Sequence, residues 1–248
     1  MTLTIPTGDL VGILSDVLPF ADPDKESPRH AVRLWWDAAQ LHAEAYSGPH
    51  WGRSTWDPDD QHFEEHQDSL ITKWGSGDAP WSIVMELPDA KEIVKIYKLS
   101  GKGVYYTPLH LDNLGGPLRI VRSADSGHSA INLVVSEVFD TWPRIDQVMQ
   151  LGQQQWQAVD DLRVNAGLLA SFGSVRQRDV MRVRFTGPDS PIHVTIGGRF
   201  IGAVMPYREP ERLAAAPAPA PVCRCEDDEG DEICPVHPDG GGDDQLPL

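Results

Sequence analysis

The first 222 residues contain no cysteine, and no apolar run in the chain is long enough to cross a bilayer. A body without cysteine cannot be stapled by disulfides, which agrees with a reducing compartment. The opening residues, Met1 to Pro6, lack the basic region and the long apolar core of a signal peptide. We therefore expect a cytoplasmic protein that does not associate with membranes.

Signatures of catalysis are also scarce. The sequence has no phosphate-cradling glycine loop and no nucleophile elbow, and its body offers no cysteine nucleophile. The segment His62-Phe-Glu-Glu-His66 matches the spacing of one metalloprotease class, but no third ligand is placed beside it. A solvated helix with surface histidines is the simpler interpretation. We predict that the protein is not an enzyme.

Positive charge is the other shortage. The chain holds 21 Lys and Arg against 37 Asp and Glu, a net charge of −16. From Glu211 onward, ten acidic residues accompany only two basic ones, so the tail carries half of the imbalance. The body is only moderately acidic, and any DNA contact must come from a local basic face.

The segment 210–248 begins with a Pro/Ala linker and continues as an acidic, Gly-rich stretch that is too polar to bury a core. It contains all three cysteines, in the pattern Cys223-x-Cys225-x8-Cys234-x2-His237. These four side chains suit tetrahedral zinc. Two interpretations stay open, a small zinc-ordered knuckle or a disordered tail with incidental thiols. No other cofactor is expected.

One pattern occurs three times before residue 210: a short strand, an amphipathic helix, and then further strands. The first helix has a predicted N-cap at Thr7 and an apolar stripe at Leu10, Ile13, Leu14, Val17 and Leu18. The second spans 89–99, with Ala90, Ile93, Val94 and Tyr97 on its buried face. The third follows a strand at 161–165, with Asn165 as N-cap and a stripe at Leu168, Leu169, Phe172 and Val175. Such short helices must pack on sheets, which predicts an α+β fold.

Three stretches resemble one family. "RFTGPDSPIHVTIGGRFIGAVMPYR" and "VNAGLLASFGSV" resemble the last half-domain of the bacterial sliding clamp, the beta subunit of DNA polymerase III. "FDTWPRI" is similar to the ending of that family's middle domain. The resemblance implies a DNA-clamp (processivity-factor) fold built from strand–helix–strands half-domains. Clamps are rings around duplex DNA, with helices lining the hole, and they catalyse no reaction.

The resemblance also divides the chain. Residues 1–149 resemble the clamp middle domain, made of two half-domains, and 150–160 form a connector. Residues 161–209 resemble the last half-domain of the clamp, and 210–248 are the tail. The expected role is that of a platform in DNA replication or repair, as an oligomer or as a reduced clamp. The alternative is a zinc-containing adaptor protein that uses the scaffold without encircling DNA.

The resemblance implies a pocket that binds short peptide motifs of DNA polymerase or other clamp-binding proteins. Its wall would come from the final strand, namely Ala203, Val204, Met205, Pro206, Tyr207 and Arg208. Pro143 would be added from the junction, and Gly48, His50 and Trp51 from the loop after "HAEAYS". This loop reads "AYSGPHW" where the family has Ala-Thr-Asp-x-x-Arg, so its polar side departs from the family pattern.

Duplex DNA would meet basic side chains on the helices. Lys91, Lys95 and Lys98 fall on one face of the second helix, and Arg176 and Arg178 follow the third. The first helix has no basic residue, and we expect it to expose Asp9 and Asp16. Without the resemblance, the lysines would be interpreted as an ordinary solvated helix face.

Overall fold

A computed structural model describes residues 2–59, 74–75, 79–98, 106–122, 131–138, 142–143, 145, 155–160, 162–175, 179–188 and 190–207. All of them belong to one compact unit, Met1–Tyr207. The predicted zinc ligands and the segment 62–66 lie outside the described residues. Within these described ranges there is no group of three or more His, Cys, Asp or Glu side chains that could hold a metal ion, and no helix is long and apolar enough to span a membrane.

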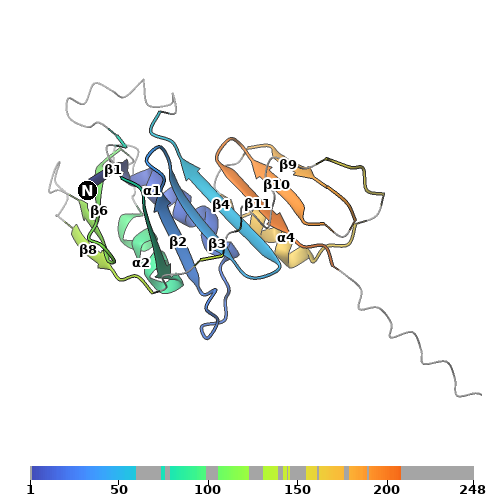
Figure 1. The fold of residues 1–248 in the computed structure, drawn as a ribbon, viewed down its shortest axis with the longest axis horizontal. Helices are drawn as coiled ribbons and strands as arrows, with labels where there is room; N and C mark the ends of the chain where they lie inside the picture. The colour runs from blue at the N-terminus through green and yellow to red at the C-terminus, as the bar shows by residue number, and fades with distance from the viewer. Residues whose placement is uncertain are drawn as a thin grey trace, which may run out of the picture. The chain divides into compact units, whose positions relative to one another are not determined.

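Three repeats follow one another along the chain (Figure 1). The first consists of β1 (Thr2–Pro6), α1 (Thr7–Val17), η1 (Leu18–Phe20), β2 (Ala31–Trp36), β3 (Leu41–Tyr46) and β4 (His50–Trp56). The second consists of β5 (Trp81–Glu86), α2 (Leu87–Tyr97), β6 (Pro108–Asn113), β7 (Leu118–Arg122) and β8 (Ile131–Val135). The third consists of α4 (Ala166–Phe172), β9 (Met181–Arg184), β10 (Ile192–Ile196) and β11 (Phe200–Val204). We call them half-domains 1, 2 and 3.

The opening strands of half-domains 1 and 2 are exchanged. The sheet orders are β1-β6-β7-β8 and β5-β2-β3-β4-β11-β10-β9, with antiparallel pairing throughout. Thus β1 adds to the sheet of half-domain 2, where Leu3 lies opposite Leu111, and β5 adds to β2. The helices α1 and α2 also pack on each other. Half-domains 1 and 2 therefore form one interlocked body.

Half-domain 3 joins this body through its last strand. β11 runs antiparallel to β4, from Phe200 opposite Ser54 to Val204 opposite His50, and makes the larger sheet continuous. Gly52 and Gly202 lie opposite each other at the centre of this ladder. They leave room for a cluster of three rings, since Phe20 lies 4.9 Å from Phe172 and 5.4 Å from Phe200 between ring centroids. The junction is thus a small aromatic core over two glycines.

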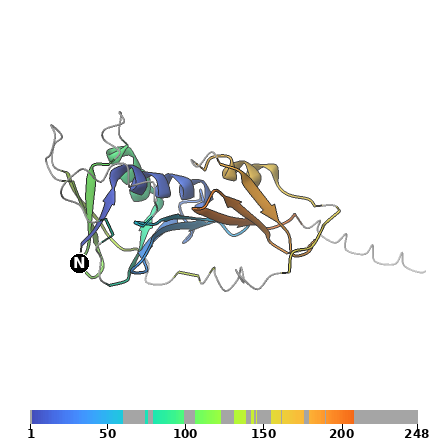
Figure 2. The same cartoon turned by 90° about the horizontal axis from the view of Figure 1, so that it is seen from above.

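The helices α1 and α4 cover the same side of the larger sheet (Figure 2). The predicted stripe of α1 is confirmed, since Leu10, Ile13, Leu14 and Val17 are buried. The predicted N-cap of α4 is also confirmed, because the Asn165 side chain accepts a 2.8 Å hydrogen bond from the Gly167 N–H. This helix and sheet arrangement is the predicted α+β fold.

Several local predictions were wrong. Pro6, not Thr7, is the N-cap of α1; Thr7 is buried and its hydroxyl donates to the Thr107 carbonyl at 2.6 Å. Leu169 is 39% exposed although its position falls on the predicted stripe of α4. Residues 162–165 hold no strand, and the carbonyl of Arg163 instead accepts a 2.7 Å hydrogen bond from the N–H of Tyr207.

Candidate functional site

A pocket of about 210 Å³ lies where the β3–β4 turn, the end of β11 and the first residues after half-domain 2 meet. Its lining is mostly apolar and includes aromatic, proline and methionine side chains. The lining residues are Tyr46, Gly48, Pro49, His50, Trp51, Pro143, Ile145, Pro191, Ala203, Val204 and Met205.

The inner wall is a small apolar cluster. Trp51 lies directly opposite Ala203 in the β4–β11 ladder, and Ile145 packs on both. These three residues are at most 8% exposed. The indole N–H of Trp51 has no hydrogen-bond partner among the described residues. The cluster gives the pocket a rigid floor that is fixed by strand register.

The turn that forms one rim is held by backbone contacts. Gly48 has a φ of 75°, in the left-handed region, and a Cβ there would also lie 2.8 Å from the Arg29 guanidinium. The N–H of Met205 donates to the Pro49 carbonyl at 2.7 Å, which ties the turn to the end of β11. The two halves of the rim therefore come from different half-domains and are linked directly.

His50 is the polar residue of the pocket. Its Nε2 lies 3.3 Å from the Pro19 carbonyl oxygen and 3.4 Å from the Ser171 hydroxyl. Because a carbonyl can only accept, Nε2 donates, and Nδ1 then accepts the 2.6 Å hydrogen bond from the Ser47 hydroxyl. Burial lowers the pKa of His50, so the ring is neutral near pH 7.

The residues after half-domain 2 are anchored by a charged network. Trp142 packs edge-on against Tyr46 with ring centroids 5.0 Å apart, and its indole N–H donates to Glu44 at 2.5 Å. Glu44 is buried, and Arg53 binds the same carboxylate at 2.7 Å. Burial raises the pKa of Glu44 although Arg53 opposes this. Pro143, the next residue, is thereby held at the pocket.

The structure brings together seven of the ten residues that the resemblance assigned to the pocket. Gly48, His50, Trp51, Pro143, Ala203, Val204 and Met205 all line it. Pro206 is buried and Tyr207 is 56% exposed, and neither is among the lining residues. Arg208 lies outside the described residues. Their role in peptide binding stays a prediction.

Four lining residues were missed. Pro49 lies between the assigned residues Gly48 and His50, and Tyr46 precedes Gly48 by two positions, so an assignment of the whole turn would have included both. Ile145 follows Pro143 by two positions. Pro191 lies immediately before β10, and no local pattern connects it with the pocket, because only the fold of half-domain 3 brings it there.

The predicted DNA-binding lysines lie on the solvent-facing side of α2 and at its C-cap. Lys91, Lys95 and Lys98 are exposed, opposite the buried residues of α2. The expectation that α1 exposes two acids was wrong, since Asp9 and Asp16 are both 4% exposed. Asp16 accepts a 2.8 Å hydrogen bond from Ser54, and Asp9 lies 3.5 Å from Arg199. Arg176 and Arg178 lie outside the described residues.

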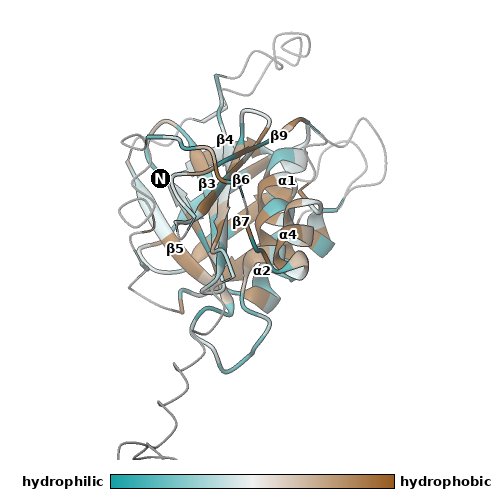
Figure 3. Ribbon diagram, turned by 90° about the vertical axis from the view of Figure 1, so that its right-hand side faces the viewer, coloured by the Kyte–Doolittle hydropathy of each residue, from teal (hydrophilic) through white to brown (hydrophobic). Residues whose placement is uncertain are grey.

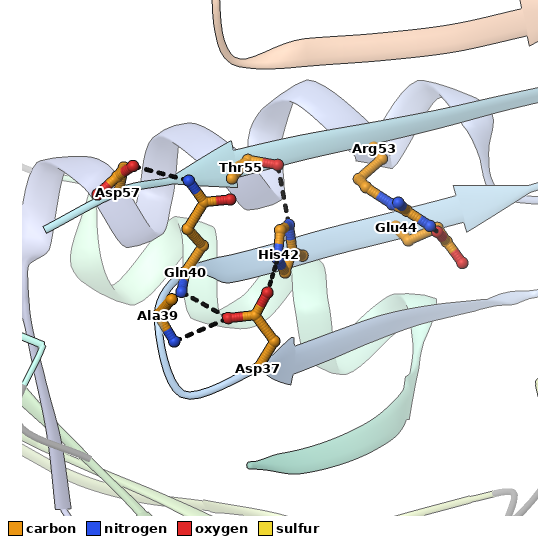
Figure 4. Close-up of polar contacts among 8 residues, drawn as sticks. All are labelled: Asp37, Ala39, Gln40, His42, Glu44, Arg53, Thr55 and Asp57. Carbon is orange, nitrogen blue, oxygen red and sulfur yellow. Dashed lines mark hydrogen bonds and ion pairs between the residues drawn. The ribbon is translucent and has the colours of Figure 1, made fainter. Parts of the chain in front are cut away.

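A polar network lies on the face of the larger sheet that points away from the helices, and it closes the β2–β3 hairpin (Figure 4). The Asp37 carboxylate accepts from the N–H groups of Ala39 and Gln40 at 2.8 and 2.7 Å. His42 links Asp37, at 3.2 Å, to the Thr55 hydroxyl, at 2.9 Å. Burial by itself would raise the pKa of Asp37, but these hydrogen bonds outweigh it and hold the pKa below its ordinary value. The network fixes a turn and is separate from the pocket.

The fold was compared with known proteins. No protein-family model and no curated protein sequence matches the chain. Solved structures do: the beta subunit of DNA polymerase III from Thermotoga maritima has a TM-score of 0.61 at 10% identity, over 84% of this chain and 66% of that one. The subunit from Pseudomonas aeruginosa has a TM-score of 0.59 at 10% identity, with the same coverage.

The DNA polymerase sliding clamp of Bacillus subtilis has a TM-score of 0.57 at 11% identity, over 84% of this chain and 64% of that one. The chain therefore spans just under two thirds of the length of the clamps it resembles. At these identities the likeness shows the fold alone, and it confirms the predicted sliding-clamp fold.

Proposed function

We propose that this chain is a non-catalytic, sliding-clamp-type platform that acts in the cytoplasm in DNA replication or repair. In this proposal, DNA polymerase or other clamp-binding proteins place a short peptide segment in the pocket beside the β3–β4 turn and the end of β11. The division into 1–149, 150–160, 161–209 and the tail is part of the same proposal. The observation that supports it most is the convergence of seven residues, from three separate parts of the sequence, around one apolar pocket.

The size and chemistry of the pocket favour a peptide anchor. Its volume of about 210 Å³ is smaller than the roughly 300–1,000 Å³ of most small-molecule sites. It therefore suits one or two apolar side chains, such as Leu or Phe. Burying such a side chain contributes about 2 kcal/mol. Aromatic and methionine linings are also common where a few residues dominate binding.

A fluorescent Gln-Leu-x-Leu-Phe peptide tests the pocket by anisotropy. We expect Met205→Ala to weaken binding about tenfold, because Met205 is a half-exposed rim residue that a Leu or Phe anchor would cover. Leu114→Ala is the matched control, because Leu114 is an exposed apolar residue in the β6–β7 turn. Equal affinity in the wild type and Met205→Ala would show that the pocket assignment is wrong.

Contact with duplex DNA through α2 is the second candidate function. The burial of Asp9 and Asp16 favours it, because the acids expected to repel phosphates on the neighbouring helix are not exposed. Three lysines are the basic groups that α2 and its C-cap expose, alongside Glu92. Three phosphate contacts would give a salt slope of about −2.7 in a plot of log affinity against log salt.

Replacement of the three lysines by glutamate tests this contact. We expect DNA binding in filter or anisotropy assays to be lost in the triple variant and to be retained in Lys25→Glu, which changes an exposed lysine outside the helices. Binding that is unchanged in the triple variant would exclude α2 as the contact. The zinc-adaptor alternative rests on the tail residues alone, and metal analysis of the protein after chelator-free purification decides it.

A further inference from the structure

Half-domains meet in two different ways within this chain. In the first, which we call the face contact, half-domains 1 and 2 pack α1 on α2 and exchange their opening strands. In the second, the edge contact, the last strands of half-domains 1 and 3 pair, β4 with β11. Half-domain 3 has no opening strand among its described residues, so the part of a face contact that it can make is the packing of its helix and sheet face.

Half-domain 3 makes an edge contact but no face contact in the part of the chain that the structure describes. Its first strand, β9, ends the sheet and has β10 as its single strand neighbour there. Its helix α4 buries only Phe172 of seven residues, whereas eight of the eleven residues of α1 are buried. The surface that its two counterparts cover is therefore open.

The open surface is apolar. Exposed side chains gather on α4 and at β9, namely Leu169 at 39%, Val180 at 77%, Met181 at 50% and Val183 at 37%. Met181 and Val183 lie opposite the buried residues Ile196 and Val194 of β10, so they belong to the core side of the sheet. Side chains that belong to the core side of a sheet are covered in the other two half-domains.

The composition of α4 points the same way. Its sequence, AGLLASF, has no charged residue, and Figure 3 shows hydrophobic colour along much of its ribbon. By contrast, α2 exposes Lys91, Glu92 and Lys95. A water-facing helix normally carries charged residues on its outer side, so an uncharged, mostly unburied helix indicates a surface that is covered by another protein.

We propose that half-domain 3 of a second copy of this chain covers this surface, with α4 and the apolar side chains of β9 packed on the same elements of the first copy and without an exchange of strands. In half-domain 3, β11 already makes the edge contact. The helix side is therefore the part of half-domain 3 that can still pack as α1 and α2 pack on each other. The helix faces of half-domains 1 and 2 are already buried against each other. Among the described residues, the open face of this kind that remains is that of half-domain 3 itself, and a two-fold contact between two such faces is self-complementary and closed.

Sedimentation equilibrium of the full chain is the first test. The expected mass is that of two chains of 27.4 kDa each at about 100 μM, where a contact with micromolar affinity is saturated. Leu169→Asp and Met181→Asp should each raise the dissociation constant at least about tenfold, because each places a charge inside the contact. Leu114→Asp changes an exposed apolar residue of the β6–β7 turn and should leave it unchanged.

Crosslinking locates the contact. In a chain whose three tail cysteines are replaced by serine, Leu169→Cys should form a covalent dimer with a short bismaleimide, and Leu114→Cys should not. Circular dichroism should match the wild type in all variants, and so should the thermal midpoint at a concentration below the dissociation constant, because the changed residues are exposed and the contact stabilises the folded chain only when it forms.

A wild type that stays monomeric at this concentration would overturn the proposal. An oligomer that is insensitive to Leu169→Asp and Met181→Asp would do the same. An oligomer lost only in Val134→Asp would place the contact on the free edge of β8, where Val134 is 55% exposed, and would also exclude the face contact. Peptide affinity is measured separately, so these outcomes are distinct from a failure of the proposed pocket.

Discussion

Gly202→Ala is expected to break the junction between half-domain 3 and the rest of the molecule. A Cβ at this position would lie 2.6 Å from the backbone oxygen of Trp51 and 2.8 Å from a ring carbon of Phe172. Ordinary contacts of a Cβ lie at 3.4–4 Å. The nearer neighbour is backbone in the paired strand, so it cannot rotate away, and the strands must separate by several tenths of an ångström.

The cost follows from packing. Inserting a methyl group into a well-packed core costs about 1–3 kcal/mol, and a rigid backbone neighbour favours the upper part of this range. We expect the free energy of unfolding in urea to fall by about 2–3 kcal/mol. Because Trp51 and Ala203 line the pocket beside this contact, the affinity for the fluorescent peptide should fall as well.

Gly198→Ala is the matched control in the turn between β10 and β11. A Cβ there would have no atom within 4 Å. This variant should be as stable as the wild type, or more stable by about 0.4–1 kcal/mol through a less flexible unfolded chain. If Gly202→Ala and Gly198→Ala unfold with the same free energy and bind the peptide equally, the close packing of β11 on β4 is wrong.

Two further predictions concern buried ionisable groups. Arg53→Ala should lower the free energy of unfolding by about 3 kcal/mol, because it leaves the Glu44 carboxylate buried without its ion pair. A Glu44→Leu/Arg53→Met double variant should recover most of this loss in urea unfolding. A double variant that is as unstable as Arg53→Ala would refute the argument from the ion pair. His50 should titrate below 6.5 in a proton NMR experiment. Because its pKa is lower in the folded than in the unfolded chain, its contribution to stability is complete above pH 6.5 and is lost as the pH falls through the folded pKa. A His50 pKa at or above 6.5 would contradict the buried, neutral ring.

Local patterns in the sequence predicted the buried residues of a helix well where one apolar face packs on the core. The 3.6-residue spacing in α2 placed Ala90, Ile93 and Tyr97 in the core, and all three are buried. The same reasoning failed for Asp9 and Asp16, because polar residues were expected on the outer face. Their partners, Arg199 and Ser54, come from distant strands and turns, and helical periodicity contains no information about them.

Strand exchange was beyond local prediction for a similar reason. The pattern in Leu3 to Pro6 indicates a strand, but it does not say which sheet that strand joins. The core-facing side chains of β1 fit β6, where Ile5 lies opposite Leu109. Each of the first two repeats thus donates its opening strand to the sheet of the other.

Most of the pocket could be assigned from the resemblance because residues of β4 and β11 form it and the two strands are paired in one register. β4 and β11 are paired through Gly52 and Gly202, and this fixes Trp51 opposite Ala203 and His50 opposite Val204. Once "GAVMPYR" is placed in a final strand that pairs with β4, its residues Ala203 to Met205 lie beside the β3–β4 turn. Residues that reach the pocket from outside this ladder, such as Pro191, are not fixed by it.

The odd number of half-domains poses a packing problem that the junction solves only in part. An unpaired unit has both an open strand edge and an open helix face, and each is a liability in water. Pairing of β11 with β4 closes one strand edge of half-domain 3 within the chain, and among the described residues β9 remains at the end of the sheet. The face of α4 and β9 keeps apolar residues in contact with solvent. The pocket forms within one chain because it needs only the β4–β11 pairing, whereas under our proposal the apolar face of half-domain 3 is covered by a second molecule.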